Sequence, residues 1–458
     1  MIENDAFKLL LINLFHLNPD DITNIVCTTF NKMMVLLVTL ADKHQACPYC
    51  GFTAPKIKEY VTKEITHSAL TTQKCIIKYR ARRYKCSCCG KTYYEFNPFV
   101  FKSQKISILT VHNILKDLKD FNETFTSVAR RYHVSPTSVS TIFDKHVDIG
   151  RNPLPEIINF DEVYAFKSEK SKYVCVLLDF KKQIPVDVLP NRKKEYLLNY
   201  FQKIPLEERK KVKYACSDMY EVYRDVVHKV FPSCCMLLDY FHLSQDFHRK
   251  MNEVRIKVMK GYKDNKASDE YYLLKKFNWL LFKNPEDEDK YGRLFDVERE
   301  RKYNSHFKSY MNYYDLRKKL LEINNDLTIC YSLKLELVDF YSKSTIDNAK
   351  VNLENLIRSC IDTNIDEMIA FSNNLINWKQ EIINSFTIVG TEYKVEADKG
   401  QVVVCNKKVN NAIIENRNKI IKCIKNNANG YTNWPRFRNR VMYVLDPNAT
   451  FSLEPREK

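Results

Sequence analysis

The chain has 458 residues, which is too long for one hydrophobic core, so we expect about three or four domains. A formal net charge of +17 favours a polyanionic partner such as nucleic acid, although Lys-rich composition alone is a weak signal. No apolar run approaches ~20 residues and the first residues lack a cationic leader, so we expect neither a membrane span nor a secretion signal. We therefore expect a cytoplasmic protein whose cysteines stay reduced.

Residues 1–100 contain two Cys-x2-Cys-Gly motifs, "CPYCG" and "CSCCG". Four thiolates on two such turns form a tetrahedral zinc site, so we expect a structural zinc ribbon with the ligands Cys47, Cys50, Cys86 and Cys89. Cys89 is preferred to Cys88 because it precedes Gly90 as Cys50 precedes Gly51. Cys75 and His44 are spare candidates. The alternative is a set of unrelated buried thiols.

Residues 101–150 read as helices, and "TFTSVARRYHVSPTSVSTIFDKHV" has the pattern of a helix-turn-helix. Val128 and Ala129 belong to the first helix, Ser135 is the expected N-cap of the second, and Pro136 its first residue. We expect Thr137, Ser138 and Ser140 to face a DNA groove and Arg130 and Arg131 to contact backbone phosphates. An ordinary helical hairpin is the alternative.

Residues 151–243 alternate between strand and helix patterns. The expected strands are "EIINFDEVYAF", "KYVCVLLDF", "IPVDVLP", "VKYACSD" and "CCMLLDYFHL", with helices at "KKEYLLNYFQKI" and "MYEVYRDVVHKVF". Residues 244–400 read as a mostly helical insertion and 401–458 as a closing segment. The prediction is a multidomain α/β protein.

Two aspartates follow the apolar parts of these strands. Asp161 lies near the end of the first strand, and Asp218 follows the fourth. Catalytic and ligand sites assemble at the carboxyl edge of an open α/β sheet. Two such aspartates with a later glutamate can coordinate two divalent cations for phosphodiester displacement, although a single strand-end Asp is often only a cap.

Glu415 is the only acidic residue between Asp398 and Asp446. If 409–427 is helical, Asn411, Glu415, Asn418 and Lys422 form a polar strip, while Ile413, Ile420 and Ile424 form an apolar one. The carboxylate then lies among amides and cations, including Lys419 and Lys422, that suit a phosphate beside a metal ion. An i,i+4 ion pair with Lys419 is the alternative.

The order zinc ribbon, helix-turn-helix, Asp, Asp, helical insertion, Glu resembles the bacterial insertion-sequence transposases of the ISL-three family. The resemblance covers nearly the whole chain and includes "CPYCG", "FDEVYAF", "SDMYEVY", "LDYFHL" and, most specifically, "NNAIIENRNKIIKCIKNNANGYTNWPRFRNR". It implies a ribonuclease H-like catalytic core, divided into 151–243 and 401–458, with Asp161, Asp218 and Glu415 as the catalytic triad. The "LDYFH" motif implies a supporting role for Asp239 and His242, against which a structural Asp–His pair is an equal alternative.

The resemblance implies a DNA transposase that binds the terminal inverted repeats of its own element. Cleavage and strand transfer would use two Mg²⁺ or Mn²⁺ ions, and the zinc would be structural. Its partners would be double-stranded DNA, as element ends and target, and further copies of the chain in a nucleoid-associated homodimer or higher oligomer. Asn416 stands where the family usually has Gly after its Glu. The alternatives are an inert DNA-binding regulator and a ribonuclease H-like nuclease that cuts without joining.

Overall fold

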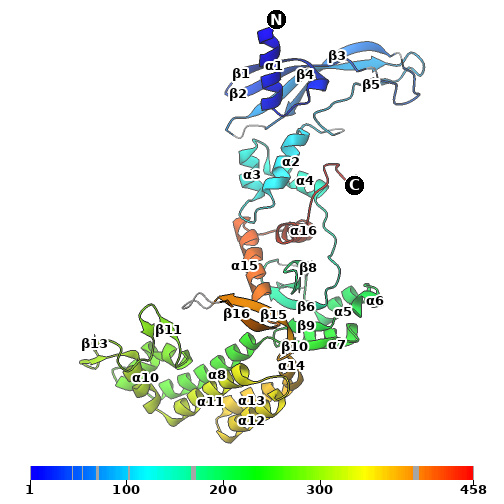
Figure 1. The fold of residues 1–458 in the computed structure, drawn as a ribbon. Coiled ribbons are helices and arrows are strands. Elements are labelled where there is room, and N and C mark those ends of the chain that lie inside the picture. The colour runs from blue at the N-terminus through cyan, green and yellow to red at the C-terminus, as the bar shows by residue number, and fades with distance from the viewer. Residues whose placement is uncertain are drawn as a thin grey trace.

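The computed structural model describes residues 2–43, 45–53, 55–68, 72–101, 104–166, 172–395 and 402–456. These segments form an elongated molecule (Figure 1): an N-terminal sheet stands at one end, a group of short helices follows, a second sheet lies in the middle, and a helical region forms the other end. Among the helices described, none combines the length and the apolar character needed to cross a bilayer.

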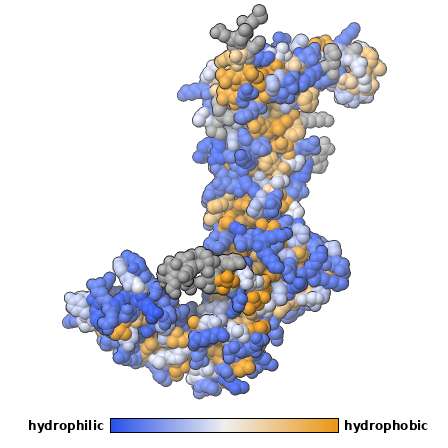
Figure 2. Space-filling model, viewed as in Figure 1, coloured by the Kyte–Doolittle hydropathy of each residue, from blue (hydrophilic) through white to orange (hydrophobic). Residues whose placement is uncertain are grey.

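The N-terminal part is a five-stranded sheet in the order β1-β2-β4-β3, with β5 paired to β4. Its elements are α1 (Ile2–Leu14), η1 (Pro19–Asp21), β1 (Ile22–Phe30), β2 (Met33–Leu40), β3 (Lys56–Thr66), β4 (Cys75–Lys85) and β5 (Thr92–Tyr94). Leu36 of β2 and Ile77 of β4 bury one face of the sheet against Ile12 of α1. Figure 2 shows hydrophobic residues at the surface of this end, where Phe7, Leu10 and Phe30 are exposed.

Three short helices follow: α2 (Ile108–Asp117), α3 (Phe125–Arg131) and α4 (Pro136–His146). The side chain of Ser135 accepts a hydrogen bond from the backbone N–H of Ser138, and Pro136 occupies the first turn of α4, as predicted. Val128 and Ala129 are buried with Val139 of α4 in one small core. The turn before α4 is therefore tight, and α3 and α4 pack closely.

The central sheet has five strands in the order β10-β9-β6-β7-β8. They are β6 (Ile157–Val163), β7 (Val174–Asp179), β8 (Pro185–Leu189), β9 (Tyr214–Ser217) and β10 (Cys235–Leu238). β6, β7 and β8 are antiparallel neighbours, whereas β9 and β10 run parallel to β6. Each strand predicted in 151–243 is present, but β10 ends at Leu238. The "DYFHL" part of the fifth predicted strand is wrong, because α8 begins at Tyr240.

Helices cover both faces of this sheet. Leu177 of β7 faces α5 (Lys194–Gln202) and α7 (Glu221–Val230), with α6 (Leu206–Arg209) between them in sequence. Its neighbour Val176 faces α15 (Ala412–Asn427) and α16 (Trp434–Leu445). Because adjacent residues of a strand point to opposite faces, a strand covered on both sides reads as a continuous apolar run, and every residue of β7 is buried.

The region predicted as a helical insertion is helical as far as Asn384. Its helices are α8 (Tyr240–Lys260), α9 (Asp269–Lys276), η2 (Asn278–Phe282), α10 (Tyr313–Glu322), α11 (Asn325–Lys343), α12 (Ala349–Asp362), α13 (Asp366–Asn377) and α14 (Lys379–Asn384). They share one hydrophobic core. Two short hairpins interrupt them, β11 (Glu288–Asp289) with β12 (Gly292–Arg293) and β13 (Lys302–Asn304) with β14 (Ser309–Met311). A longer hairpin, β15 (Ile388–Val395) with β16 (Val402–Lys408), then leads into α15, so 388–395 is strand and not helix.

Candidate active site

Three aspartates lie at the same height along neighbouring strands, at one edge of the central sheet. In the parallel ladders Asn159 of β6 pairs with Cys216 of β9, and Leu238 of β10 pairs with Ser217 of β9. Two residues further along β6 and β9 come Asp161 and Asp218, and Asp239 follows Leu238 directly. The carboxyl ends of parallel strands meet at one edge of a sheet, so these carboxylates form a row.

Burial and neighbouring negative charges raise the pKa values of the aspartates in this row. Burial and, to a lesser extent, the nearby charge of Asp218 raise the pKa of Asp161 to about 7. Burial likewise raises the pKa of Asp218 to about 6, with a further contribution from Glu162. The Oδ1 atom of Asp218 is buried and accepts no hydrogen bond from any residue that the structure describes. Nearby His242 and Arg192 lower the pKa of Asp218 only in part, and desolvated carboxylates of this kind are the environment that a metal ion relieves.

Glu415 comes to the same edge from α15. The Nε2 atom of His242 lies 3.8 Å from Oδ2 of Asp239 and 3.9 Å from Oε1 of Glu415. One ligand atom of each of these three residues lies within 4.8 Å of the other two, a spacing compatible with a shared metal ion. Glu415 therefore neighbours His242, and within the described chain it makes no ion pair with Lys419, whose Nζ instead lies 3.4 Å from Oδ1 of Asn416.

Buried asparagines join α15 to the sheet. The Asn418 amide donates a hydrogen bond of 2.8 Å to Oδ2 of Asp161. Asn411, fully buried at the start of α15, accepts a 2.7 Å hydrogen bond from the Asn159 amide. These contacts fix the rotation of α15 and bring Glu415 toward the aspartates.

The strips predicted on α15 are partly wrong. Ile414, Ile421 and Ile424 are the fully buried isoleucines, while Ile413 and Ile420 are only half-buried. The amides of Asn411 and Asn418 are buried against β6, whereas Lys419 and Lys422 are exposed. A buried polar residue is tolerated when it is hydrogen-bonded, so the buried face of α15 is not simply its apolar one.

Two residues near the row were not singled out from the sequence. Asn159 is a fully buried polar residue in β6, and Glu162 contacts Arg192 and accepts a 3.3 Å hydrogen bond from the Tyr223 hydroxyl. A polar residue inside the apolar run "IINFDEV" was the available signal for Asn159. Glu162 neighbours Asp161 in sequence, and its side chain also affects the pKa of Asp218.

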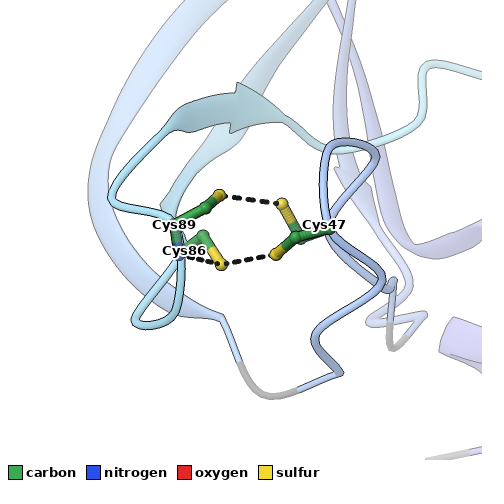
Figure 3. A group of neighbouring side chains, drawn as sticks. Cys47, Cys86 and Cys89 are labelled. Carbon is green, nitrogen blue, oxygen red and sulfur yellow. Dashed lines mark hydrogen bonds between the residues drawn. The ribbon is translucent and has the colours of Figure 1, made fainter.

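The four cysteines predicted as zinc ligands form a second cluster, in the N-terminal part. The Sγ atoms of Cys47 and Cys89 are 3.7 Å apart and those of Cys50 and Cys86 are 3.5 Å apart (Figure 3). Tetrahedral Zn–S bonds of about 2.3 Å place sulfurs about 3.8 Å apart, so the cluster has the size of a zinc site. Gly51 and Gly90 have φ of +75° and +69°, the left-handed conformation that these turns need. Cys88 is exposed and not part of the cluster, and Cys75 is buried in β4. His44 lies outside the described residues.

The predicted DNA-contacting residues differ in their surroundings. Arg130 is exposed, whereas Arg131 is held by ion pairs with Asp117 and Glu123. At the start of α4 Thr137 is exposed, Ser138 lies 2.8 Å from the Ser135 hydroxyl, and Ser140 donates to the Thr137 carbonyl. Arg131 therefore stabilises the helical unit, and Arg130 is the arginine of this pair that is available to a ligand.

Comparison with known proteins identifies the class. A sequence model of the DDE transposases of the ISL3 type, described as "Transposase", matches residues 158–397, more than half of the chain. The chain is also similar to the transposase for insertion sequence element IS1001 of Bordetella parapertussis, with 19% identity over 409 residues, covering 89% of this chain and 90% of that protein. The chain belongs to the ISL3 family of insertion-sequence transposases, as the sequence motifs predicted. The family match spans Asp161 and Asp218 and ends before Glu415.

Proposed function

We propose that the protein is a DNA transposase that binds the terminal inverted repeats of its own insertion sequence, cleaves the DNA there and transfers the strands to target DNA. The row of Asp161, Asp218 and Asp239 beside Glu415 carries this proposal. Paired carboxylates at the carboxyl edge of an α/β sheet are suited to hold divalent cations against a phosphodiester. Membership of a transposase family gives DNA as the partner and divalent metal ions as the expected cofactors.

The central sheet supports a ribonuclease H-like core. Three antiparallel strands followed by two parallel ones, with the first strand in the middle, give the order β10-β9-β6-β7-β8. On this proposal the core comprises 151–243 and 401–458, and the region 244–400 interrupts it. The first strand carries Asp161, the fourth leads to Asp218, and the last helices return to the sheet with Glu415.

The residues present fit two Mg²⁺ or Mn²⁺ ions. The unpartnered Oδ1 of Asp218 and the raised pKa values of Asp161 and Asp218, which His242 and Arg192 offset only in part, mark carboxylates that a further positive charge would stabilise. Asp161, Asp218 and Glu415 would hold the ions, which supply Lewis-acid activation of the attacking oxygen and stabilisation of the leaving oxygen. Zn²⁺ bound by Cys47, Cys50, Cys86 and Cys89 would be structural.

The protein's own groups position these carboxylates. Asn418 fixes the orientation of Asp161 by donating to Oδ2, which leaves Oδ1 to accept the backbone N–H of Glu162 at 2.7 Å. The Nε2 atom of His242 lies 3.8 Å from Asp239 and 3.9 Å from Glu415, so on this proposal a protonated imidazole would support both carboxylates. Asn416, which stands where the family usually has Gly, is exposed, and its Oδ1 lies 3.4 Å from Nζ of Lys419.

The DNA-binding surfaces follow from the charge and the helical unit. We expect α3 and α4 to form the helix-turn-helix, with Thr137, Ser138 and Ser140 at the groove and Arg130 at the backbone. Arg131 stays a predicted phosphate contact, although its two ion pairs make it the weaker one. Lys419 and Lys422 extend from α15 into solvent and suit the DNA backbone near the catalytic edge. Bringing two element ends together requires at least two protomers, so we expect a DNA-bound homodimer or higher oligomer.

The test incubates purified protein with a labelled duplex of the element's own end, a supercoiled target plasmid and Mg²⁺ or Mn²⁺. A transposase gives a nicked end with a 3′-hydroxyl and a joined product of end and plasmid. Cleavage without joining would favour a ribonuclease H-like nuclease, and binding without cleavage an inert regulator. Asp218→Asn should abolish both products, and Asp225→Asn, an acid on α7 paired with Lys194, is the matched control.

A further inference from the structure

A polar pocket of about 460 Å³ lies between the start of α3 and the loop that joins α15 to α16. We call it the α3–α15 pocket. Thr126 and Arg130 line it from α3, and Asn427, Asn429 and Thr432 line it from the end of α15 and the loop. All of its lining residues are described, and none is an Asp or Glu. A pocket of amides, hydroxyls and cations without a carboxylate suits an anion.

One uncompensated positive charge reaches this pocket. Arg436 also lines it, but its guanidinium makes a two-point ion pair with Asp144, with Nε at 2.9 Å from Oδ1 and Nη2 at 2.6 Å from Oδ2. Arg130 is exposed and lies within ion-pair distance of no carboxylate in the described part of the chain. The pocket therefore has a net positive charge available to a phosphate, the group with which arginine pairs best.

The two walls of the pocket belong to one packed unit. The Tyr443 hydroxyl of α16 donates to the Leu115 carbonyl of α2 at 3.0 Å. The guanidinium of Arg440, which is 1% exposed, donates to the carbonyls of Asp120 and Glu123 at 2.8 and 2.7 Å. On its other side α16 packs through Phe437 and Val441 against the apolar face of α15 and the sheet. Because α16 contacts both, the helical unit cannot move freely relative to α15.

We infer that the α3–α15 pocket binds one backbone phosphate of the element-end duplex and thereby sets the distance between the recognised sequence and the cleaved bond. This inference rests on the proposed function. Asn427 follows Glu415 by twelve residues on α15, a rise of about 18 Å at 1.5 Å per residue. At about 3.4 Å per base pair along one strand, that distance corresponds to roughly five base pairs. For an end duplex that runs along α15, the bound phosphate should therefore lie about five base pairs from the scissile one.

The experiment pairs changes in the DNA with changes in the protein. A series of end duplexes carries a single neutral methylphosphonate at successive positions from the cleavage site, and binding to the full-length protein is measured by fluorescence anisotropy. We expect one position about five base pairs from the cleaved bond to weaken wild-type binding by roughly fivefold to tenfold. Arg130→Ala should weaken binding to unmodified DNA by as much as that methylphosphonate weakens wild-type binding. It should also reduce the salt dependence by about one phosphate contact and abolish the effect of the methylphosphonate at that position.

Two variants and two outcomes make the result unambiguous. Arg130→Lys should retain most of the binding and the sensitivity to the same position. Arg358→Ala, which removes an exposed arginine of α12, should leave the pattern of wild type. Arg130→Ala and the methylphosphonate could also act independently, so that their effects on the dissociation constant multiply at every position. That result would overturn the pocket inference and leave the proposed function intact. Failure of wild type to bind the end duplex at all would overturn the proposed function itself.

Discussion

Replacing Asp161 by Asn should stabilise the metal-free protein at neutral and higher pH while abolishing cleavage. Burial raises the pKa of Asp161 from 3.8 to about 7, so its ionisation in the folded protein costs on the order of 4 kcal/mol at 1.36 kcal/mol per pH unit. An amide removes that charge and keeps one oxygen to accept the Asn418 hydrogen bond, while its NH2 group cannot accept the Glu162 backbone N–H, a loss that offsets part of the gain. The same substitution removes a proposed metal ligand, so stability and activity should change in opposite directions.

The sign of the pH dependence follows from linkage. A carboxyl whose folded pKa is raised binds more protons in the folded state than in the unfolded state between about pH 4 and pH 7. Its contribution therefore lowers stability progressively as pH rises through that window, and the full cost is present above pH 7. The advantage of Asp161→Asn should accordingly be less than half as large near pH 5 as at pH 8.

Thermal unfolding in EDTA at pH 5, 6.5 and 8 measures this difference. We expect the melting temperature of Asp161→Asn to exceed that of wild type by several degrees at pH 8. Mg²⁺ or Mn²⁺ should then stabilise wild type more than the variant, because the ion compensates a charge that only wild type carries. A variant that is no more stable than wild type at pH 8, with a difference that does not change with pH, would refute the reasoning from desolvation.

Three further predictions concern other parts of the chain. Cys86→Ser should release the bound zinc and lower the melting temperature of the N-terminal part, measured by atomic absorption and calorimetry, whereas Cys88→Ser, which changes the exposed neighbour, should do neither. Burial lowers the pKa of His67, whose ring nitrogens lie 2.9 Å from the Ser107 hydroxyl and 2.8 Å from the Phe15 carbonyl oxygen. Stability should therefore fall as pH drops below about 6.5, and His67→Gln should flatten that dependence in urea unfolding between pH 7.5 and 5. Arg131→Ala should cost on the order of 1 kcal/mol after solvent screening, and it should lower the number of phosphate contacts read from the salt dependence of end-DNA binding by less than Arg130→Ala does.

The features that the sequence predicted well are those with a strict local pattern. Cys50 and Cys89 each precede a glycine with positive φ, so the spacing alone specified the turns that bring the thiols together. The continuous apolar run of β7 marked a strand buried on both faces. Ser135 and Pro136 marked the start of α4 for a similar local reason, because the start of a helix leaves backbone N–H groups unpaired. The Ser135 side chain accepts a hydrogen bond from one of them, and Pro136 has no N–H to pair.

The features that sequence reasoning missed depend on partners distant in the chain. The burial of Asn411 and Asn418 is paid for by hydrogen bonds to β6, about 250 residues away, so no helical pattern within α15 shows which face is buried. The hairpins at 288–311 have strands of two or three largely exposed residues, too short for an alternating pattern. The strand predicted through Leu243 ends at Leu238, because Asp239 is the N-cap of α8 and the apolar residues after it fit either structure.

Cleavage of a labelled duplex carrying the element's own end, in Mg²⁺ or Mn²⁺, by wild type and Glu415→Gln, tests the central claim most directly. Binding of the same duplex is measured in parallel. The account predicts metal-dependent cleavage that disappears in the variant while DNA binding is kept, because the Gln side chain preserves the shape of α15 but cannot serve as an anionic ligand. Equal cleavage by both proteins would contradict the assignment of Glu415 to the catalytic centre.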